Sequence, residues 1–243
     1  MSMEQYRHEL KYIISYPEYE ALRRLMLPYF RLDPHAVNGE YMIRSLYFDD
    51  YYGSAYEEKE MGIYARKKYR IRIYNYSDKS IKLERKKKQG KYIYKESAAI
   101  SRDEFYRILD GDYGFLLESD NNLLKEFYIE CVSNVLRPRV IVDYERVPFM
   151  LDEGTVRITF DKRVRAAVGD YDIFDESLTT LSCMEGTKLI MEVKYTEFLP
   201  QNVRNIVIPS ASEMIAASKY VICCDKTAFL HKQQYYCDEK YVL

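Results

Sequence analysis

Positively charged side chains alternate along two neighbouring segments of the sequence in a pattern suited to binding a polyanion. Every second residue from 66 to 72 is Lys or Arg, and every second residue from 82 to 88 is Lys or Glu. Successive side chains of a β-strand point to opposite faces, so each alternating set would share one face of a sheet. The alternative interpretation is an ordinary solvent-exposed face of the sheet. Like charges on paired strands would destabilise such a face. The pattern therefore favours a face that holds phosphate groups.

Three carboxylates stand among the cations of such alternating segments. Glu9 alternates with Lys11, Glu84 lies within the second segment, and Glu192 alternates with Lys194. Carboxylate oxygens are hard ligands suited to Mg²⁺ or Mn²⁺. We therefore expect Glu192 to ligate a divalent metal ion, the alternative being an ion pair with Lys194 or a neighbouring arginine. For Glu9 and Glu84, metal ligation, orientation of a cation and simple ion pairing stay open as alternatives.

The sequence lacks the motifs of several other phosphate-binding and hydrolytic sites. It contains no G-x-x-x-x-G-K-[ST] or G-x-G-x-x-G loop and no G-x-S-x-G segment. The histidines, His8, His35 and His231, show no metal-ligand spacing. Phosphoryl transfer without a glycine-rich loop requires side-chain cations that position the phosphates and neutralise their charge. This sequence supplies such cations.

Eight strand-like segments are expected to position these residues. They span residues 5–15, 42–49, 64–76, 80–89, 91–100, 137–151, 155–166 and 188–196. Gln89-Gly90 fits a tight hairpin turn between two of them. Helices are expected to begin at Pro17 and at the capping boxes Ser101–Glu104 and Ser210–Glu213, and to span 122–133. Consecutive hairpins favour an α+β, β-dominated fold, an antiparallel sheet or closed barrel with flanking helices, over a doubly wound one.

The composition is that of a globular protein with a local charge asymmetry. The chain has 243 residues, 47% of them hydrophobic and 31% charged, with 26 Tyr and no Trp. The net charge of −1 argues against a nucleic-acid-binding protein, because many of those have an excess of basic residues. The charge is nevertheless uneven, since residues 64–95 hold 13 Lys or Arg and only two acids. Without a repeat or linker, we expect a single domain over 1–243. The five cysteines show no C-x-x-C spacing, which favours reduced thiols. The sequence shows no apolar leader segment and no long apolar run, so we expect a cytoplasmic location.

Nine short motifs, in order, resemble the VTC-type polyphosphate polymerase domain of the triphosphate tunnel metalloenzymes, relatives of the CYTH proteins. They are R-H-E-L-K-Y (7–12), R-S-L-Y-F-D (44–49), K-Y-R-I-R-I-Y (68–74), L-E-R-K (83–86), Y-K-E-S (94–97), R-P-R-V-x-V-D-Y-E-R-V-P-F (137–149), V-R-I-T-F-D (156–161), M-E-V-K-Y (191–195) and S-K-Y (218–220). Each motif is weak alone, but their order along nearly the whole chain makes the resemblance specific.

The resemblance implies a closed, eight-stranded antiparallel β-tunnel whose polar lumen binds ATP, triphosphate or polyphosphate. In the polymerase branch the γ-phosphate of ATP is transferred to a growing polyphosphate chain with Mn²⁺ or Mg²⁺. The positions that match phosphate-binding or catalytic residues are Lys11, Arg70, Arg72, Lys86, Lys95, Arg146, Arg157, Ser218 and Lys219, and Glu192 matches the metal-binding glutamate. Among these, Lys95, Arg146, Ser218 and Lys219 depend on the resemblance alone. The resemblance leaves open the oligomeric state and a membrane-protein partner that would accept the polymer.

The first strand departs from the CYTH pattern. CYTH triphosphatases begin with E-x-E-x-K, whereas this chain has Arg7-x-Glu9-x-Lys11. The lost glutamate removes a carboxylate from the metal site, which favours the polymerase branch. The alternatives are a tunnel triphosphatase or nucleotidyl cyclase on the same scaffold, and a non-catalytic module that binds polyphosphate, inositol polyphosphates or RNA. The like-charged face also predicts that Arg70→Ala or Arg72→Ala relieves repulsion and leaves the unliganded protein at least as stable.

Overall fold

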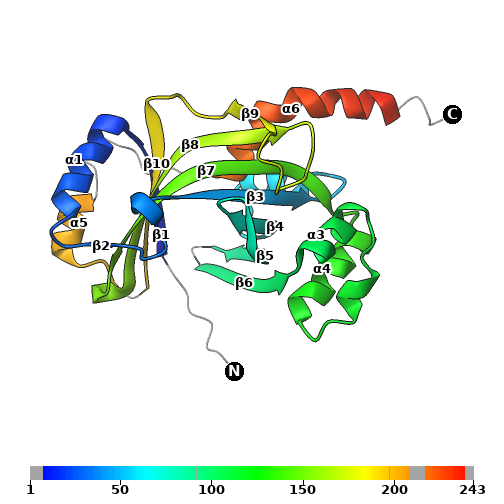
Figure 1. Ribbon diagram of the computed structural model, residues 1–243, viewed down its shortest axis with the longest axis horizontal. Helices are drawn as coiled ribbons and strands as arrows, with labels where there is room; N and C mark the ends of the chain where they lie inside the picture. The colour runs from blue at the N-terminus through cyan, green and yellow to red at the C-terminus, as the bar shows by residue number, and fades with distance from the viewer. Residues whose placement is uncertain (1–7, 91, 197, 208–216, 239–243) are drawn as a thin grey trace.

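The core of the protein is one twisted antiparallel sheet. The computed structural model describes residues 8–90, 92–196, 198–207 and 217–238. In the order in which they lie side by side, the strands are β1 (His8–Ser15), β10 (Lys188–Tyr195), β8 (Val156–Val168), β7 (Arg137–Leu151), β3 (Tyr41–Asp49), β4 (Ala65–Tyr74), β5 (Ser77–Gln89) and β6 (Tyr92–Ile100) (Figure 1). All eight predicted strands and the β-dominated α+β fold are therefore confirmed.

Two short strands lie off this path and were not expected. β2 (Arg31–Leu32) pairs with β7, and β9 (Thr179–Ser182) pairs with β8. The predicted hairpin turn joins β5 to β6, and Gly90 adopts a left-handed φ of 56° there. Its N–H donates to Tyr64 O at 2.9 Å, and a Cβ at this position would approach the Tyr64 ring to 2.7 Å. Glycine is therefore required at this turn for both its conformation and its lack of a side chain.

The sheet curls on itself, but hydrogen bonds do not close it. β1 and β6 are its two edges, and within the described ranges no backbone ladder joins them. Side chains make the connection instead, because Lys86 Nζ on β5 donates to Glu9 Oε2 on β1 at 2.7 Å. The expected closed tunnel thus has a seam at which an ion pair replaces strand pairing.

Six helices flank the sheet in the described part of the chain. They are α1 (Tyr16–Met26), α2 (Ser54–Glu60), α3 (Arg102–Leu109), α4 (Asn122–Ser133), α5 (Gln201–Val207) and α6 (Lys219–Asp238). The prediction for 122–133 is confirmed, as is the capping box of Ser101 with Glu104. α1 begins at Tyr16, one residue before Pro17, because Ser15 forms a capping box with Glu18. The expected box at Ser210–Glu213 lies outside the described residues, and no helix within the described ranges is long and apolar enough to span a membrane.

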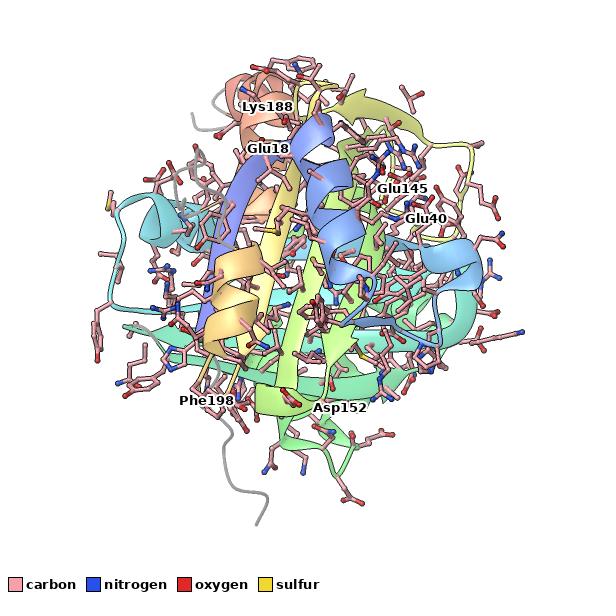
Figure 2. The ribbon with its side chains drawn as sticks, turned by 90° about the vertical axis from the view of Figure 1, so that its left-hand side faces the viewer. Glu18, Glu40, Glu145, Asp152, Lys188 and Phe198 are labelled. Carbon is pink, nitrogen blue, oxygen red and sulfur yellow. The ribbon has the colours of Figure 1, made fainter. Side chains whose placement is uncertain are left out.

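Apolar residues form three clusters, two on the outer side of the sheet and one on its inner side. One lies under α3 and α4 and includes Phe105 and Phe127, a second lies under α1 and α5, and a third lies against α6. Figure 2 shows α1, with Glu18 near its start, beside α5 and over the strands of the sheet. Each fully buried Phe contributes about 2 to 3 kcal/mol. The first two clusters thus lie outside the curl, whereas the third lies on the inner side, where Tyr41 stands opposite Arg146 and Ile190 stands opposite Asp161.

Candidate functional site: a charged inner face

Alternation along the strands brings the charged residues to one side of the sheet. We call this side the inner face and define it by Lys11, Arg70, Lys86, Arg146 and Glu192. The chain positions before and after Arg70, and those before and after Glu192, are buried in the apolar clusters on the other side. Three groups of ion pairs lie on the inner face, together with Lys68, which has no carboxylate partner among the described residues.

Glu84 on β5 is the centre of the first group. Its carboxylate accepts hydrogen bonds from Arg70 Nε at 2.7 Å and from Lys95 Nζ at 2.6 Å, and Arg72 Nη1 lies 3.8 Å away. Arg70 stands directly opposite Glu84 in the ladder between β4 and β5. Burial alone would raise the pKa of Glu84, but Arg70, Arg72 and Lys95 outweigh it and hold this pKa below its usual range. Glu84 therefore stays charged and orients both arginines.

Asp161 on β8 organises the second group. Arg146 binds it with two parallel hydrogen bonds, from Nε to Oδ1 at 2.7 Å and from Nη2 to Oδ2 at 2.8 Å. Lys219, at the start of α6, also contacts Asp161 Oδ2. Burial opposes ionisation of Asp161, but Arg146 and Lys219 together lower its pKa. A fully buried aspartate thus fixes one cation from the sheet and one from the helix.

Glu9 and Glu192 share the lysines of the third group. Lys11 Nζ lies 3.3 Å from Glu192 and 3.7 Å from Glu9, and Lys194 Nζ lies 2.8 Å from Glu192. Lys86 completes the group through Glu9. Burial lowers the pKa of Lys11 to about 7 and the pKa values of Lys86 and Lys194 to about 8. The neighbouring cations add to this effect, and the carboxylates oppose it. This end of the face is therefore short of negative charge.

Lys68 on β4 has no carboxylate partner in the described part of the chain. Its Nζ donates to Ser218 Oγ at 3.1 Å and lies 4.6 Å from the centre of the Tyr220 ring. Burial, followed by repulsion from Lys59 and Lys11, lowers the pKa of Lys68 to about 7. A buried ammonium in this setting is stabilised when an anion arrives.

Two tyrosines complete the arginine sites, and the sequence reasoning assigned no chemistry to them. Arg70 Nη1 donates to Tyr47 Oη at 2.8 Å, and Arg72 Nη2 to Tyr144 Oη at 3.4 Å. Burial would raise the pKa of Tyr144, but Arg146, Arg72 and Lys219 lower it to about 8. Strand parity was an available signal, because Tyr144 shares a face with Arg146 two residues later.

The structure brings most of the sequence-predicted residues into these groups. Lys11, Arg70, Arg72, Lys86, Lys95, Arg146, Ser218 and Lys219 all contact another member, as do Glu9, Glu84 and Glu192. Arg157 differs in its contacts. Its Nη2 donates to Asp33 Oδ2 at 2.8 Å and to Tyr41 Oη at 3.1 Å, and its side chain is 40% exposed.

One prediction about the cations on the other face of the sheet is wrong, the one for Arg85. Lys67, Arg85 and Lys87 lie on the opposite parity in the sequence, which predicts that they are exposed or stand at the tunnel entrance. Lys87 is exposed, but the Arg85 side chain is only 3% exposed and pairs with Glu96 and Glu126. Arg85 is thus a buried structural ion-pair residue under α4, because the helix covers this part of the outer face.

The carboxylates of the third group fit a divalent cation better than Glu84 does. Glu84 already receives hydrogen bonds on both of its oxygens. Glu9 Oε1 is buried without a hydrogen-bond partner, and the lysines shared with Glu192 bring the two carboxylates to one place. Within the described ranges no group of three or more His, Cys, Asp or Glu side chains forms a ready-made cage. Mg²⁺ commonly binds through one or two carboxylates plus substrate phosphates, which this pair could provide.

Comparison with known families and structures agrees with this architecture. The family model of the VTC domain matches residues 6–228. No curated protein matches the sequence. A solved Hippeastrum protein, studied as an adenylyl cyclase and found to have a dominant triphosphatase activity, is 13% identical and superimposes with a TM-score of 0.54 over 91% of this chain and 96% of that one.

Other similar structures include an adenylate cyclase-like protein of Bacillus halodurans. It is 10% identical and aligns with a TM-score of 0.48 over 84% of this chain and 86% of that one. A Pyrococcus horikoshii protein is 13% identical and aligns with a TM-score of 0.49 over 91% and 99% of the two chains.

Proposed function

The chain belongs to the VTC domain family, and we propose that it is a polyphosphate polymerase that transfers the γ-phosphate of ATP to a polyphosphate chain. The observation that carries the proposal is the pair Arg70, which is half-buried, and Arg72, which is buried, both oriented by Glu84 on a face where cations outnumber carboxylates. An arginine fork binds phosphate oxygens through two N–H groups at once.

Each group of the inner face would take one part of the transfer. Arg70 and Arg72 would hold the phosphates of the donor, with Tyr47 and Glu84 fixing the arginine planes. Lys219 would bring a further positive charge from α6, which Asp161 positions. Phosphoryl transfer needs little covalent chemistry from the protein, so fixed cations that neutralise the moving phosphoryl group supply most of the catalysis.

Glu192 and Glu9 are the residues that would hold Mn²⁺ or Mg²⁺. Such an ion, when bound, neutralises charge on the phosphate oxygens of the substrate. The protein itself contributes the two carboxylates. Burial would raise the pKa of Glu9, but Lys11, Lys86 and Lys194 outweigh it and hold this pKa well below its usual range, so Glu9 stays ionised.

Hydrolysis is the second candidate function. The Hippeastrum protein that shares the fold has a dominant triphosphatase activity. The difference between the two reactions is the acceptor, a polyphosphate end or a water molecule. Arg7, the residue whose departure from E-x-E-x-K favours the polymerase, lies outside the described residues. The acceptor must therefore be identified by experiment.

Incubation of the purified protein with ATP and Mn²⁺ separates the candidates by product. A polymer sensitive to exopolyphosphatase supports the polymerase, free phosphate alone supports the triphosphatase, and a cyclic nucleotide supports the cyclase. No turnover together with tight polyphosphate binding identifies a non-catalytic binding module. Arg70→Lys is a suitable comparison because it keeps the charge and removes the planar fork.

A further inference from the structure

Two cysteines that are far apart in the sequence meet where α6 packs on the sheet. Cys183 directly follows β9, and its N–H donates to Val164 O on β8 at 2.9 Å. Cys223 lies on α6, and its Sγ is 3.7 Å from Arg165 O on the same strand. A hydrogen bond joins the two thiol side chains directly. The two sulfur atoms are therefore neighbours while both cysteines are reduced.

The surroundings of the two thiols give them different reactivity. Cys183 is half-buried, whereas Cys223 is fully buried. The hydrogen bond from Cys223 lowers the pKa of Cys183 against the effect of burial, and Lys226 adds to the lowering. The same hydrogen bond, together with burial, raises the pKa of Cys223. Because the thiolate is the nucleophile in cysteine chemistry, Cys183 is the residue that reacts first.

The other cysteines whose side chains the structure describes are poorly suited to this chemistry. Cys131 and Cys224 are buried, and burial raises the pKa of each thiol to about 12. A protonated and covered thiol reacts slowly with an oxidant. Within this set, Cys183 is thus the cysteine that combines access to solvent with a lowered pKa.

We propose that Cys183 and Cys223 form a reversible disulfide that fastens α6 to the sheet when a peroxide oxidises the protein. The Cys183 thiolate attacks the peroxide, breaks its O–O bond and becomes a sulfenic acid, and the peroxide leaves as an alcohol or as water. The Cys223 sulfur then attacks the Cys183 sulfur, gives up its proton and displaces a second molecule as water. Two thiols are thereby oxidised to one disulfide and the peroxide is reduced, and exchange with a small thiol reverses the reaction.

The disulfide acts on the helix that completes the inner face. α6 begins at Lys219, whose ammonium contacts Asp161. Cys223 follows four residues later, so it lies on the same side of the helix one turn further along. A covalent link at this point holds the first turns of α6, and with them Lys219, against β8. The inference goes beyond the proposed function, because it does not depend on which reaction the inner face catalyses.

The first test identifies the disulfide in the whole protein. The reduced protein is treated with a small excess of hydrogen peroxide, its free thiols are alkylated, and peptides are mapped by mass spectrometry. We expect a mass loss of about 2 Da before alkylation, one linked pair of peptides that contain Cys183 and Cys223, and full reversal by dithiothreitol. Cys183→Ala should form no disulfide, whereas the matched control Cys131→Ala should behave as the wild type. A wild type without this link, or with a link through Cys224, would overturn the proposal.

The second test asks whether the link holds α6 in its native place. Oxidation of the wild type should slow amide hydrogen exchange in α6 by at least about tenfold and raise the melting temperature by roughly 5 to 10 °C. Both effects should disappear with dithiothreitol and should be absent from peroxide-treated Cys183→Ala. Faster exchange in α6 or a lower melting temperature after oxidation would contradict the fastening of the helix.

Discussion

Replacing Lys68 with methionine should stabilise the unliganded protein and weaken its binding of polyphosphate. The ammonium group is buried against Ser218 and Tyr220 and has no carboxylate partner among the described residues. Burial and the nearby cations lower the pKa of Lys68 to about 7 from the usual 10.5. Methionine keeps a flexible apolar side chain of similar length and removes the charge.

The expected gain follows from the size of this pKa change. Lowering the pKa of Lys68 from 10.5 to about 7 corresponds to an unfavourable free energy on the order of 5 kcal/mol for the charged form. The lost hydrogen bond to Ser218 costs about 1 kcal/mol, and relaxation of the site takes up part of the rest. We therefore expect a net increase of about 2 to 3 kcal/mol in the free energy of unfolding below pH 7.

The pH dependence gives this prediction a definite sign. Between about pH 7 and 10.5 the unfolded chain keeps the Lys68 proton and the native protein releases it, so wild-type stability rises with pH in this range. The variant has no such group at position 68, and its advantage over the wild type should shrink as the pH rises.

Urea denaturation of both proteins near pH 6.5 and pH 9, and calorimetry with polyphosphate, would check these expectations. Lys87→Met is the control, since it removes an exposed charge on the other face and should change stability by less than about 0.5 kcal/mol. A Lys68→Met protein that is less stable near pH 6.5 and binds polyphosphate as well as the wild type would refute the reasoning.

Three further predictions follow from the paired groups. Arg70→Ala should cost about 3 kcal/mol of unfolding free energy, because buried Glu84 loses its main partner, and should remove most triphosphate affinity; denaturation and calorimetry measure both, and undiminished affinity contradicts the assignment. Glu192→Gln should bind triphosphate at least as well as wild type without metal yet lose turnover with Mn²⁺, so a wild-type rate and metal dependence in a Mn²⁺ titration would reduce Glu192 to a counter-charge. Triphosphate affinity should fall as the pH rises from about 6.5 to 9, because Lys11 and Lys86, with pKa values of about 7 and 8, must be protonated to bind it. Calorimetry in buffers of different ionisation enthalpy should detect proton uptake on binding, and the absence of uptake would contradict this prediction.

Alternation was sufficient to predict the eight long strands and the face of most of their charged residues, whereas Lys95 and Arg146 were assigned from the family resemblance alone. Period-2 patterns located β4 and β5 and placed Arg70 and Glu84 on one face, because a strand has only two faces. The pattern could not supply the ladder register, which sets Arg70 directly opposite Glu84. The expectation that Arg70→Ala relieves repulsion therefore changes, since Arg70 is paired with Glu84, whereas Lys68 has no carboxylate partner among the described residues.

Residues that depend on long-range packing escaped the sequence reasoning. Arg85 has the parity of an outer-face residue, but only the placement of α4 over that face makes it buried. Tyr47 and Tyr144 resemble the many other strand tyrosines until the arginines that donate to them are placed. The short strands β2 and β9 contain too few residues to show an alternating pattern.

Transfer of labelled phosphate tests the central claim most directly. The protein would be incubated with Mn²⁺ and ATP labelled either at the γ-phosphate or at the α-phosphate, and the products separated by chain length. Polymerase activity predicts that the γ-label alone enters a polymer that exopolyphosphatase degrades, with ADP as the other product. A γ-label found only in free phosphate, or an α-label found in a cyclic nucleotide, would contradict it.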